Sequence, residues 1–74
     1  MFPSKKIQSL VGRVIHVEMK GERFVLEGML RSVDDYLNLH LGDANEILEG
    51  EKRRSLGSVI LRGNNVVLIN SLKE

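Results

Sequence analysis

The chain has 74 residues, enough for one small domain, and no cysteine, so neither a disulfide nor a thiolate metal site can stabilise it. Its net charge is +1 with 28% charged residues, which indicates a mixed-charge globular surface and excludes a polybasic nucleic-acid-binding tail. No apolar run approaches the roughly 20 residues that a transmembrane helix needs, so we expect no membrane partner and a cytoplasmic protein.

The N-terminal residues 4–10 predict a short helix. Three apolar residues at helical spacing share one of its faces: Ile7, Leu10 and Val11. We expect this face to cover an open end of the remaining structure. The alternative is that Lys5 and Lys6 of the same helix contact the phosphates of a ligand.

The rest of the chain has the period-two alternation of half-buried strands. The pattern predicts five strands, over residues 14–19, 24–33, 37–48, 56–61 and 66–69. Gly28 predicts a bend or close packing in the second strand, and Gly42–Asp43 predict a bulge in the third. The fold class is therefore mostly β: one domain over residues 1–74, with a short N-terminal helix and a strongly bent five-stranded antiparallel sheet.

Several polar segments are expected to connect these strands. Gly21 suits a turn residue with positive φ, and Gly63–Asn65 suit a turn for the same reason. The mixed charges of residues 49–54, together with Gly50, indicate a connection at the end of a hairpin. Within it, Lys52–Arg54 are expected to be solvated, with a binding patch as the alternative.

The last strand is expected to pair with a strand of another subunit. Residues 66–69 are apolar on both faces, and the first and last strands of the predicted sheet would each leave an unpaired edge. A small domain without cysteines is also marginally stable alone. Pairing of edges between subunits is head to tail and repeats until a ring closes, so we expect a ring that a proline at Leu68 would dissociate.

No pattern in the sequence indicates catalysis. The serines are isolated in sequence, and His16 and His40 belong to different strands. Asp34 and Asp35 would point to opposite faces of a strand, and no carboxylate set suits a metal. There is neither a phosphate-binding Walker loop nor a dinucleotide fingerprint. We expect a binding module, not an enzyme, with no metal or cofactor.

The polar residues at two strand junctions form a candidate site for a planar ligand. Tyr36 offers a ring on which a base can stack, and Arg62 offers a flat guanidinium. The Asn38 amide suits the N3–H and a carbonyl of uracil, but a freely flipping amide also suits cytosine. Selectivity for uracil therefore requires Asp34 or a backbone group to fix the amide. The alternative is that Tyr36 is an exposed tip aromatic and Arg62 an edge charge.

Two stretches of the chain resemble the sequence patterns of the Sm/Sm-like (LSm) family, most closely its archaeal members. The first pattern is matched by Gly28, Leu30, Asp34 and Asn38–Leu39. The second is matched by Leu56–Gly57, Val59, Leu61, Arg62–Gly63, Asn65–Val66 and Ile69. Both occur in order and at compatible spacing, and with the strand before Gly28 the resemblance covers most of the chain.

The resemblance implies an Sm fold, a small open barrel, in a homo-oligomeric ring of six or seven subunits in which the fourth strand of one subunit meets the fifth of the next. It implies binding of U-rich single-stranded RNA near a central pore, one base per subunit, in RNA processing or metabolism. The implied RNA-binding residues are Tyr36, Asn38, Arg62, Gly63 and Asn64, with Asp34 as the organising residue.

Two positions depart from the family pattern. Tyr36 stands where archaeal relatives often have histidine, which keeps a stacking face but removes a titratable group. Asn64 stands where many relatives have aspartate, which weakens a charged hydrogen bond. Asn64 and the small net charge leave open a second function, a ring-shaped protein scaffold with weak or no RNA binding; a small-ligand hydrolase is a third.

Overall fold

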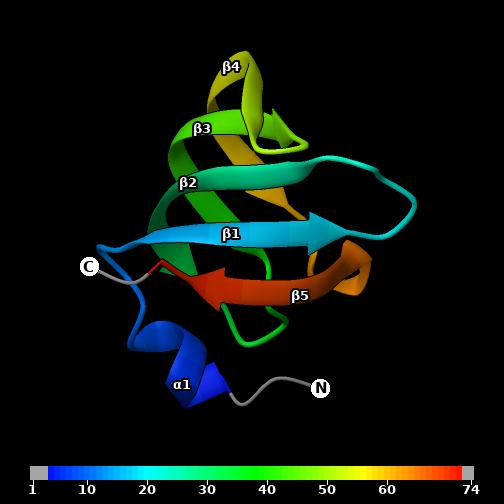
Figure 1. Ribbon diagram of the computed structural model, residues 1–74. Coiled ribbons are helices and arrows are strands. Elements are labelled where there is room, and N and C mark those ends of the chain that lie inside the picture. The colour runs from blue at the N-terminus through cyan, green and yellow to red at the C-terminus, as the bar shows by residue number, and fades with distance from the viewer. Residues whose placement is uncertain (1–3, 73–74) are drawn as a thin grey trace.

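The computed structural model describes residues 4–72, which form one short helix and a single five-stranded antiparallel sheet (Figure 1). The elements in order are α1 (Ser4–Gln8), β1 (Val14–Met19), β2 (Val25–Val33), β3 (Leu39–Leu48), β4 (Glu51–Leu61), the 3-10 helix η1 (Gly63–Asn65) and β5 (Val66–Ser71). This architecture confirms the predicted mostly-β class. Neither described helix is long and apolar enough to cross a membrane.

The strand order in the sheet is β4-β3-β2-β1-β5, so the two free edges belong to β4 and β5. The expectation that the first strand has a free edge is wrong. After β4 the chain turns through η1 and returns alongside β1, so Ile15 has Gly28 on one side and Ser71 on the other. Figure 1 shows how the long strands β2, β3 and β4 bend to make this return possible.

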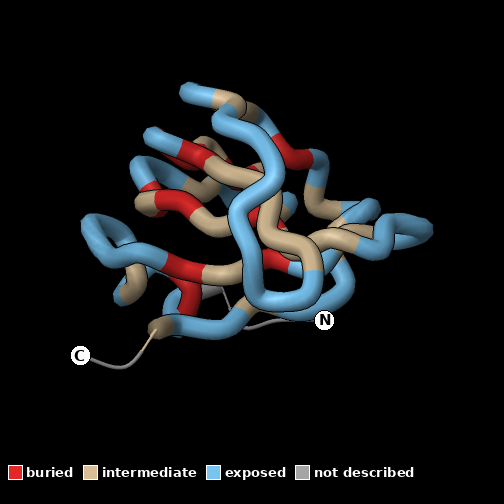
Figure 2. The backbone as a smooth tube through the Cα atoms, turned by 45° about the horizontal axis from the view of Figure 1, so that its top comes forward, coloured by how far each residue is buried: buried red, intermediate tan, exposed pale blue. Residues whose placement is uncertain are grey.

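The core lies inside the bent sheet, where the buried segments of the tube gather (Figure 2). Alternation works as predicted in β1, where Ile15 and Val17 are fully buried. The other buried apolar residues come from the helix and the remaining strands: Ile7, Leu26, Leu30, Leu39, Leu41, Ala44 and Leu61. Three large apolar side chains stay exposed on the two edge strands: Ile60, Val67 and Leu68.

Gly28 and the bulge in β3 allow the sheet to curl tightly. A Cβ atom at Gly28 would lie 3.1 Å from both the Leu41 Cβ and the Gly42 carbonyl oxygen, so β2 and β3 approach closely there, as predicted. The pairing register of β3 shifts between Leu41 and Ala44, and Asp43 adopts a left-handed φ of 50°. This is the predicted bulge, and it increases the local bend of the strand.

The N-terminal helix is shorter than predicted and buries fewer residues. It ends at Gln8 instead of Leu10, and the chain continues in turns to Gly12. Ile7 is buried in the core and Leu10 packs against it, but Val11 is 44% exposed and lies outside. Lys5 and Lys6 are both exposed, so their contact with a ligand stays a prediction.

The predicted hairpin end between the third and fourth strands is confirmed, but it is shorter than residues 49–54. Only Glu49 and Gly50 form the turn, with φ of 52° and 81°, and β4 already begins at Glu51. Two consecutive left-handed residues are the geometry of a tight hairpin. Three of the charged residues in this segment, Glu51, Lys52 and Arg54, are instead paired with β3. Arg54 also forms a 2.8 Å ion pair with Glu46 of that strand.

Candidate functional site

Asp34 holds together the tip that joins β2 to β3. Its Oδ1 accepts the backbone N–H groups of Tyr36 and Asn38, and its Oδ2 accepts the side-chain Nδ2–H of Asn38, each at 2.9 Å. These hydrogen bonds favour the ionised carboxylate and lower the pKa of Asp34, the Asn38 side chain making the largest contribution. The tight tip forces Leu37 into a left-handed φ of 62°, so β3 begins at Leu39 and not at Leu37 as predicted.

Asn38 connects this tip to the turn before β5. Its Oδ1 accepts the backbone N–H of Gly63 at 2.9 Å. A side chain at Gly63 would collide with the Tyr36 carbonyl oxygen, so only glycine allows the two segments to come so close. The turn itself is the 3-10 helix η1, without positive φ at Gly63 or the asparagines, in contrast to the predicted turn geometry.

The orientation of the Asn38 amide follows from these two partners. The carboxylate of Asp34 can only accept and the Gly63 N–H can only donate, so Nδ2 must face Asp34 and Oδ1 must face Gly63. In a flipped amide, Nδ2 would face the Gly63 N–H, donor against donor, and Oδ1 would face the Asp34 carboxylate, acceptor against acceptor. Both contacts would be repulsive. One Nδ2 hydrogen and one Oδ1 lone pair remain available to a ligand.

An open hollow lies where the two segments meet. It is lined by Tyr36, Asn38, Arg62, Asn64 and Asn65. The Tyr36 side chain is largely free, since the residue is 82% exposed. The structure therefore brings four of the predicted site residues round one hollow, with Gly63 and Asp34 anchoring Asn38 from two sides. Asn65 was not predicted as a site residue, although its place in the same polar turn was a usable signal.

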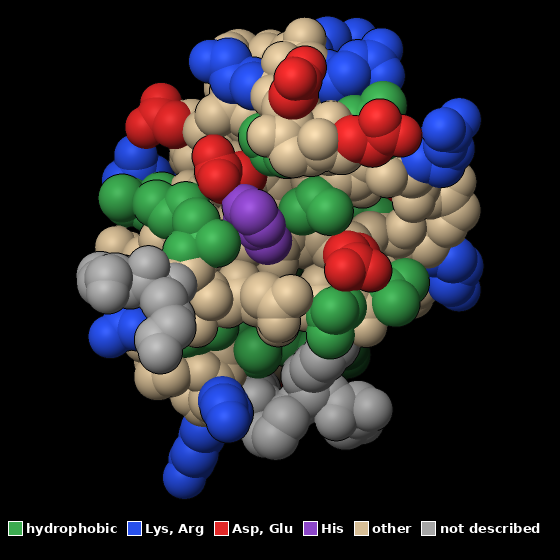
Figure 3. Space-filling view, in the orientation of Figure 1, with side chains coloured by type: hydrophobic (Ala, Val, Ile, Leu, Met, Phe, Trp, Pro, Cys, Tyr) green, Lys and Arg blue, Asp and Glu red, His purple; other side chains and the backbone are tan. Residues whose placement is uncertain are grey.

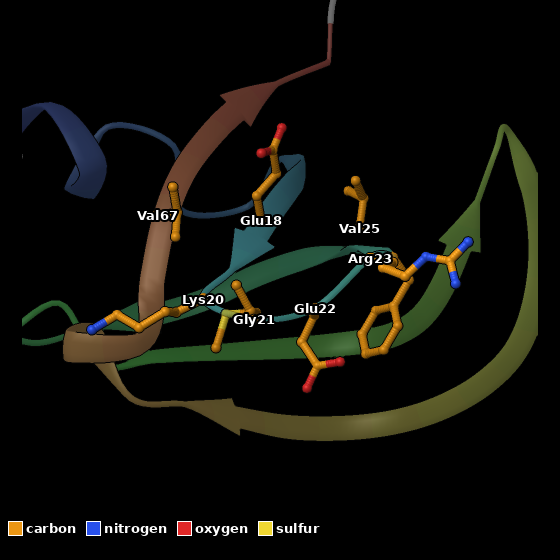
Figure 4. A pocket seen from close by; sticks show the side chains of 9 residues that line it. Glu18, Lys20, Gly21, Glu22, Arg23, Val25 and Val67 are labelled. Carbon is orange, nitrogen blue, oxygen red and sulfur yellow. The ribbon is translucent and has the colours of Figure 1, made fainter.

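A second hollow lies between the β1–β2 turn and β5 (Figure 4). The close-up shows Lys20 and Glu22 on the turn, Glu18 on β1 and Val67 on β5. Its lining carries both signs of charge beside an exposed edge strand. The lining also includes Arg23 and Phe24, but no side-chain amide lies beside the aromatic ring, in contrast to the hollow that Tyr36 and Asn38 line.

The two histidines, His16 and His40, each contact a different polar side chain. His16 was expected to be solvated; it is half-buried and lies 2.9 Å from the Glu27 carboxylate. The sequence suggested that every serine is isolated from a base. The structure shows one exception, because His40 Nε2 lies 2.7 Å from Ser58 Oγ. Among residues 4–72 no carboxylate hydrogen-bonds His40, and no three metal-ligating side chains gather in one place. A serine–histidine contact without an orienting third group lacks the parts of a catalytic triad.

Comparison with known proteins places this geometry in a family. The family described as "LSM domain" matches residues 5–71 of the chain. The small nuclear ribonucleoprotein F of Schizosaccharomyces pombe is 38% identical over 68 residues, which cover 90% of this chain and 85% of that protein.

Solved structures of archaeal proteins share the fold. An Sm-like protein of Archaeoglobus fulgidus has a TM-score of 0.91 and 53% identity, covering 97% of this chain and 96% of that one. A heptameric archaeal Sm protein has a TM-score of 0.83 and 32% identity, covering 93% and 98%. A Pyrococcus abyssii Sm protein in complex with a uridine heptamer has a TM-score of 0.86 and 29% identity, covering 97% and 100%.

Proposed function

Because the chain belongs to the LSM domain family, whose members are RNA-binding ring proteins and not enzymes, we propose that it binds U-rich single-stranded RNA as a homo-oligomeric ring. Each subunit holds one base near the central pore, and the ring acts in RNA processing or metabolism. The observation that carries the proposal is the oriented Asn38 amide beside Tyr36 and Arg62 in one hollow. The uridine heptamer bound by the Pyrococcus abyssii relative supports it.

The free groups of Asn38 match uracil. Its remaining Oδ1 lone pair accepts the N3–H of the base, and its remaining Nδ2 hydrogen donates to the neighbouring carbonyl. Cytosine in the same pose would present an acceptor to Oδ1 and an amino group to Nδ2, so both contacts would be repulsive. Tyr36 stacks on the base, and Arg62 stacks on it or binds phosphate.

The two free edges of the sheet support the proposed ring. Exposed apolar residues lie on β4 and β5, the strands whose outer backbone groups have no partner within the described sheet. Joining β4 of one subunit to β5 of the next covers both edges and closes a ring of six or seven copies. The heptameric archaeal relative supports this arrangement. A single Sm-like domain over residues 1–74 and a cytoplasmic location stay predictions.

A ring-shaped protein scaffold is the second candidate, favoured by Asn64 in place of an aspartate and by the small net charge. Native mass spectrometry with and without oligo-U tests the proposal, because it reports subunit number and RNA stoichiometry together. A binding assay with oligo-U, oligo-C and oligo-A completes it. Equal affinity for all three would favour the scaffold.

Replacing Tyr36 by alanine removes the stacking ring. We expect oligo-U affinity to fall by about 1–3 kcal/mol for each stacked base, the usual range for base–aromatic stacking, while the ring survives. Fluorescence anisotropy at low salt measures the loss, and Tyr36→Phe serves as the control that keeps the ring face. Unchanged affinity in Tyr36→Ala would show that Tyr36 is not a stacking platform.

Replacing Asp34 by asparagine removes the acceptor that orients the Asn38 amide. The backbone N–H groups of Tyr36 and Asn38 would hold the one oxygen of the new amide, so its NH2 group would face Nδ2 of Asn38. The Gly63 N–H prevents Asn38 from flipping in response. We expect the preference for oligo-U over oligo-C to fall by up to about 1–3 kcal/mol, the usual discrimination of a bidentate pair. Asp35→Asn is the matched control, with the same charge change beside the site. An unchanged U/C ratio in Asp34→Asn would contradict the orienting role.

The same carboxylate determines how the tip responds to acid. Because the pKa of Asp34 is lowered in the folded chain, its hydrogen bonds stabilise the tip at every pH above the usual aspartate range. That stabilisation is lost only as the pH falls through the lowered pKa. Carboxyl NMR titration should give Asp34 a midpoint below the usual range, and the Asn38 side-chain amide signals should shift with it. A normal midpoint would contradict this.

A further inference from the structure

Four basic residues lie at the end of the molecule opposite the Asn38 hollow: Arg23, Lys52, Arg53 and Arg54. Asn38 precedes the first residue of β3, whereas Lys52, Arg53 and Arg54 follow the hairpin at the other end of β3. Figure 1 shows this hairpin and the tip before β3 on opposite sides of the fold. Blue side chains gather over the hairpin end in Figure 3, with acidic side chains among them. Glu49 and Glu51 of the hairpin are both exposed.

A bulge in β4 directs two consecutive arginines into one place. Glu46 pairs with Arg54 and Ile47 pairs with Lys52, so Arg53 is an extra residue without its own partner. In a regular strand, neighbouring side chains point to opposite faces. A bulge changes the direction of a side chain, and here both Arg53 and Arg54 line the same hollow. Lys52 does not line it.

The hollow combines charge with an aromatic face. It is lined by Phe24, Glu46, Arg53 and Arg54. Arg54 is fixed by a 2.8 Å contact between its Nη2 and Glu46 Oε2, and the Glu46 side chain is only 12% exposed. One carboxylate leaves donors of Arg54 free. Within residues 4–72, Arg53 forms no ion pair.

Arg23 adds a further positive charge near this end of the molecule. Val25 pairs with Ile47, so the segment before β2 runs beside the end of β3. In Figure 4 the Arg23 side chain points to that side of the fold. An arginine pair next to a half-buried aromatic ring suits a phosphate with an attached planar base.

We propose that this hollow is a second RNA-binding site, which holds a nucleotide of the strand outside the uridine-binding hollows. Arg53 and Arg54 bind its phosphate, and its base stacks against Phe24. A ring would carry one such hollow per subunit, so a longer strand gains contacts that a short oligo-U does not reach. The proposal rests on the RNA-binding function proposed above.

The experiment compares two RNAs and two matched variants. The RNAs are a uridine heptamer and the same heptamer with an unstructured tail of mixed sequence. Arg53→Gln should weaken binding of the tailed RNA and lower its salt dependence by about 0.7 log unit per log unit of salt for each lost phosphate contact. Binding of the heptamer should not change. Lys52→Gln removes the same charge from the neighbouring residue outside the hollow and should behave like the wild type.

A photo-crosslinking base in the tail gives a second readout, which should map to the peptide that contains Phe24 in the wild type and be lost in Arg53→Gln. Native mass spectrometry verifies that the variant rings are intact. Equal effects of Arg53→Gln and Lys52→Gln would show diffuse attraction and overturn the site. No effect of Arg53→Gln on the tailed RNA, as expected of a protein-binding surface, would also overturn it. Failure of the wild type to bind the heptamer would count against the proposed function alone, and the tail RNA by itself would then test the hollow.

Discussion

Replacing Ile69 by proline is expected to break the ring into monomers. The N–H of Leu72 donates to the Val14 carbonyl of β1, and the pairing of β5 with β1 is regular from Ser71 to Leu68, so the N–H groups of residues 70 and 68 also face β1. The N–H of Ile69 therefore points to the free edge, where β4 of the next subunit would accept it. Proline removes this donor, and Ile69→Ala is the control for the loss of the partly buried side chain.

Leu68→Pro is the informative comparison. The sequence suggested Leu68 as the position that dissociates the ring, but its N–H faces β1 inside the subunit. We therefore expect Leu68→Pro to destabilise the subunit itself and Ile69→Pro to act on assembly. Light scattering measures the mass, and circular dichroism melts measure the fold. An Ile69→Pro protein that keeps the mass of the wild-type ring would contradict the proposed β4–β5 interface.

The strands were predictable wherever alternation alone decides structure. Val14–Met19 was predicted with its observed bounds, because its inward residues Ile15 and Val17 alternate with polar ones. Boundaries failed where side chains contact distant backbone. Leu37 is apolar and in phase with β3, yet the hydrogen bonds of Asp34 hold it in the tip. Residues 51–54 are charged like a loop, yet pairing with β3 makes them strand.

The site residues were predictable as a group, but their arrangement was not. Resemblance placed Tyr36, Asn38 and Arg62 together, and reasoning about amide flips required something to orient Asn38. From the sequence, either Asp34 or a backbone group could orient this amide. In the structure both do so, and the backbone group is the Gly63 N–H. This contact joins residues 25 positions apart, so no local pattern reveals it. The Arg53 bulge was hidden for the same reason, since it depends on the register of two strands.

The dependence of affinity on RNA length should be the largest effect in binding. One hollow formed by Tyr36, Asn38 and Arg62 is small and open, so a single uridine nucleotide should bind weakly. Covalent linkage turns each further base into an intramolecular event at high effective concentration, which raises overall affinity by about 10²–10⁴-fold over a single site. Affinity should therefore climb steeply with the number of uridines.

The climb should stop when every subunit holds a base. The length at which affinity levels off should equal the subunit number from native mass spectrometry, and titration calorimetry over a series of oligo-U lengths measures both the slope and the plateau. Arg62→Gln offers the control, because it weakens each hollow and should lower the whole curve without moving the plateau. Salt should weaken binding only moderately, since the net charge of a subunit is +1 and the bases carry the specificity. An affinity that is independent of length would contradict one base per subunit and favour the protein scaffold.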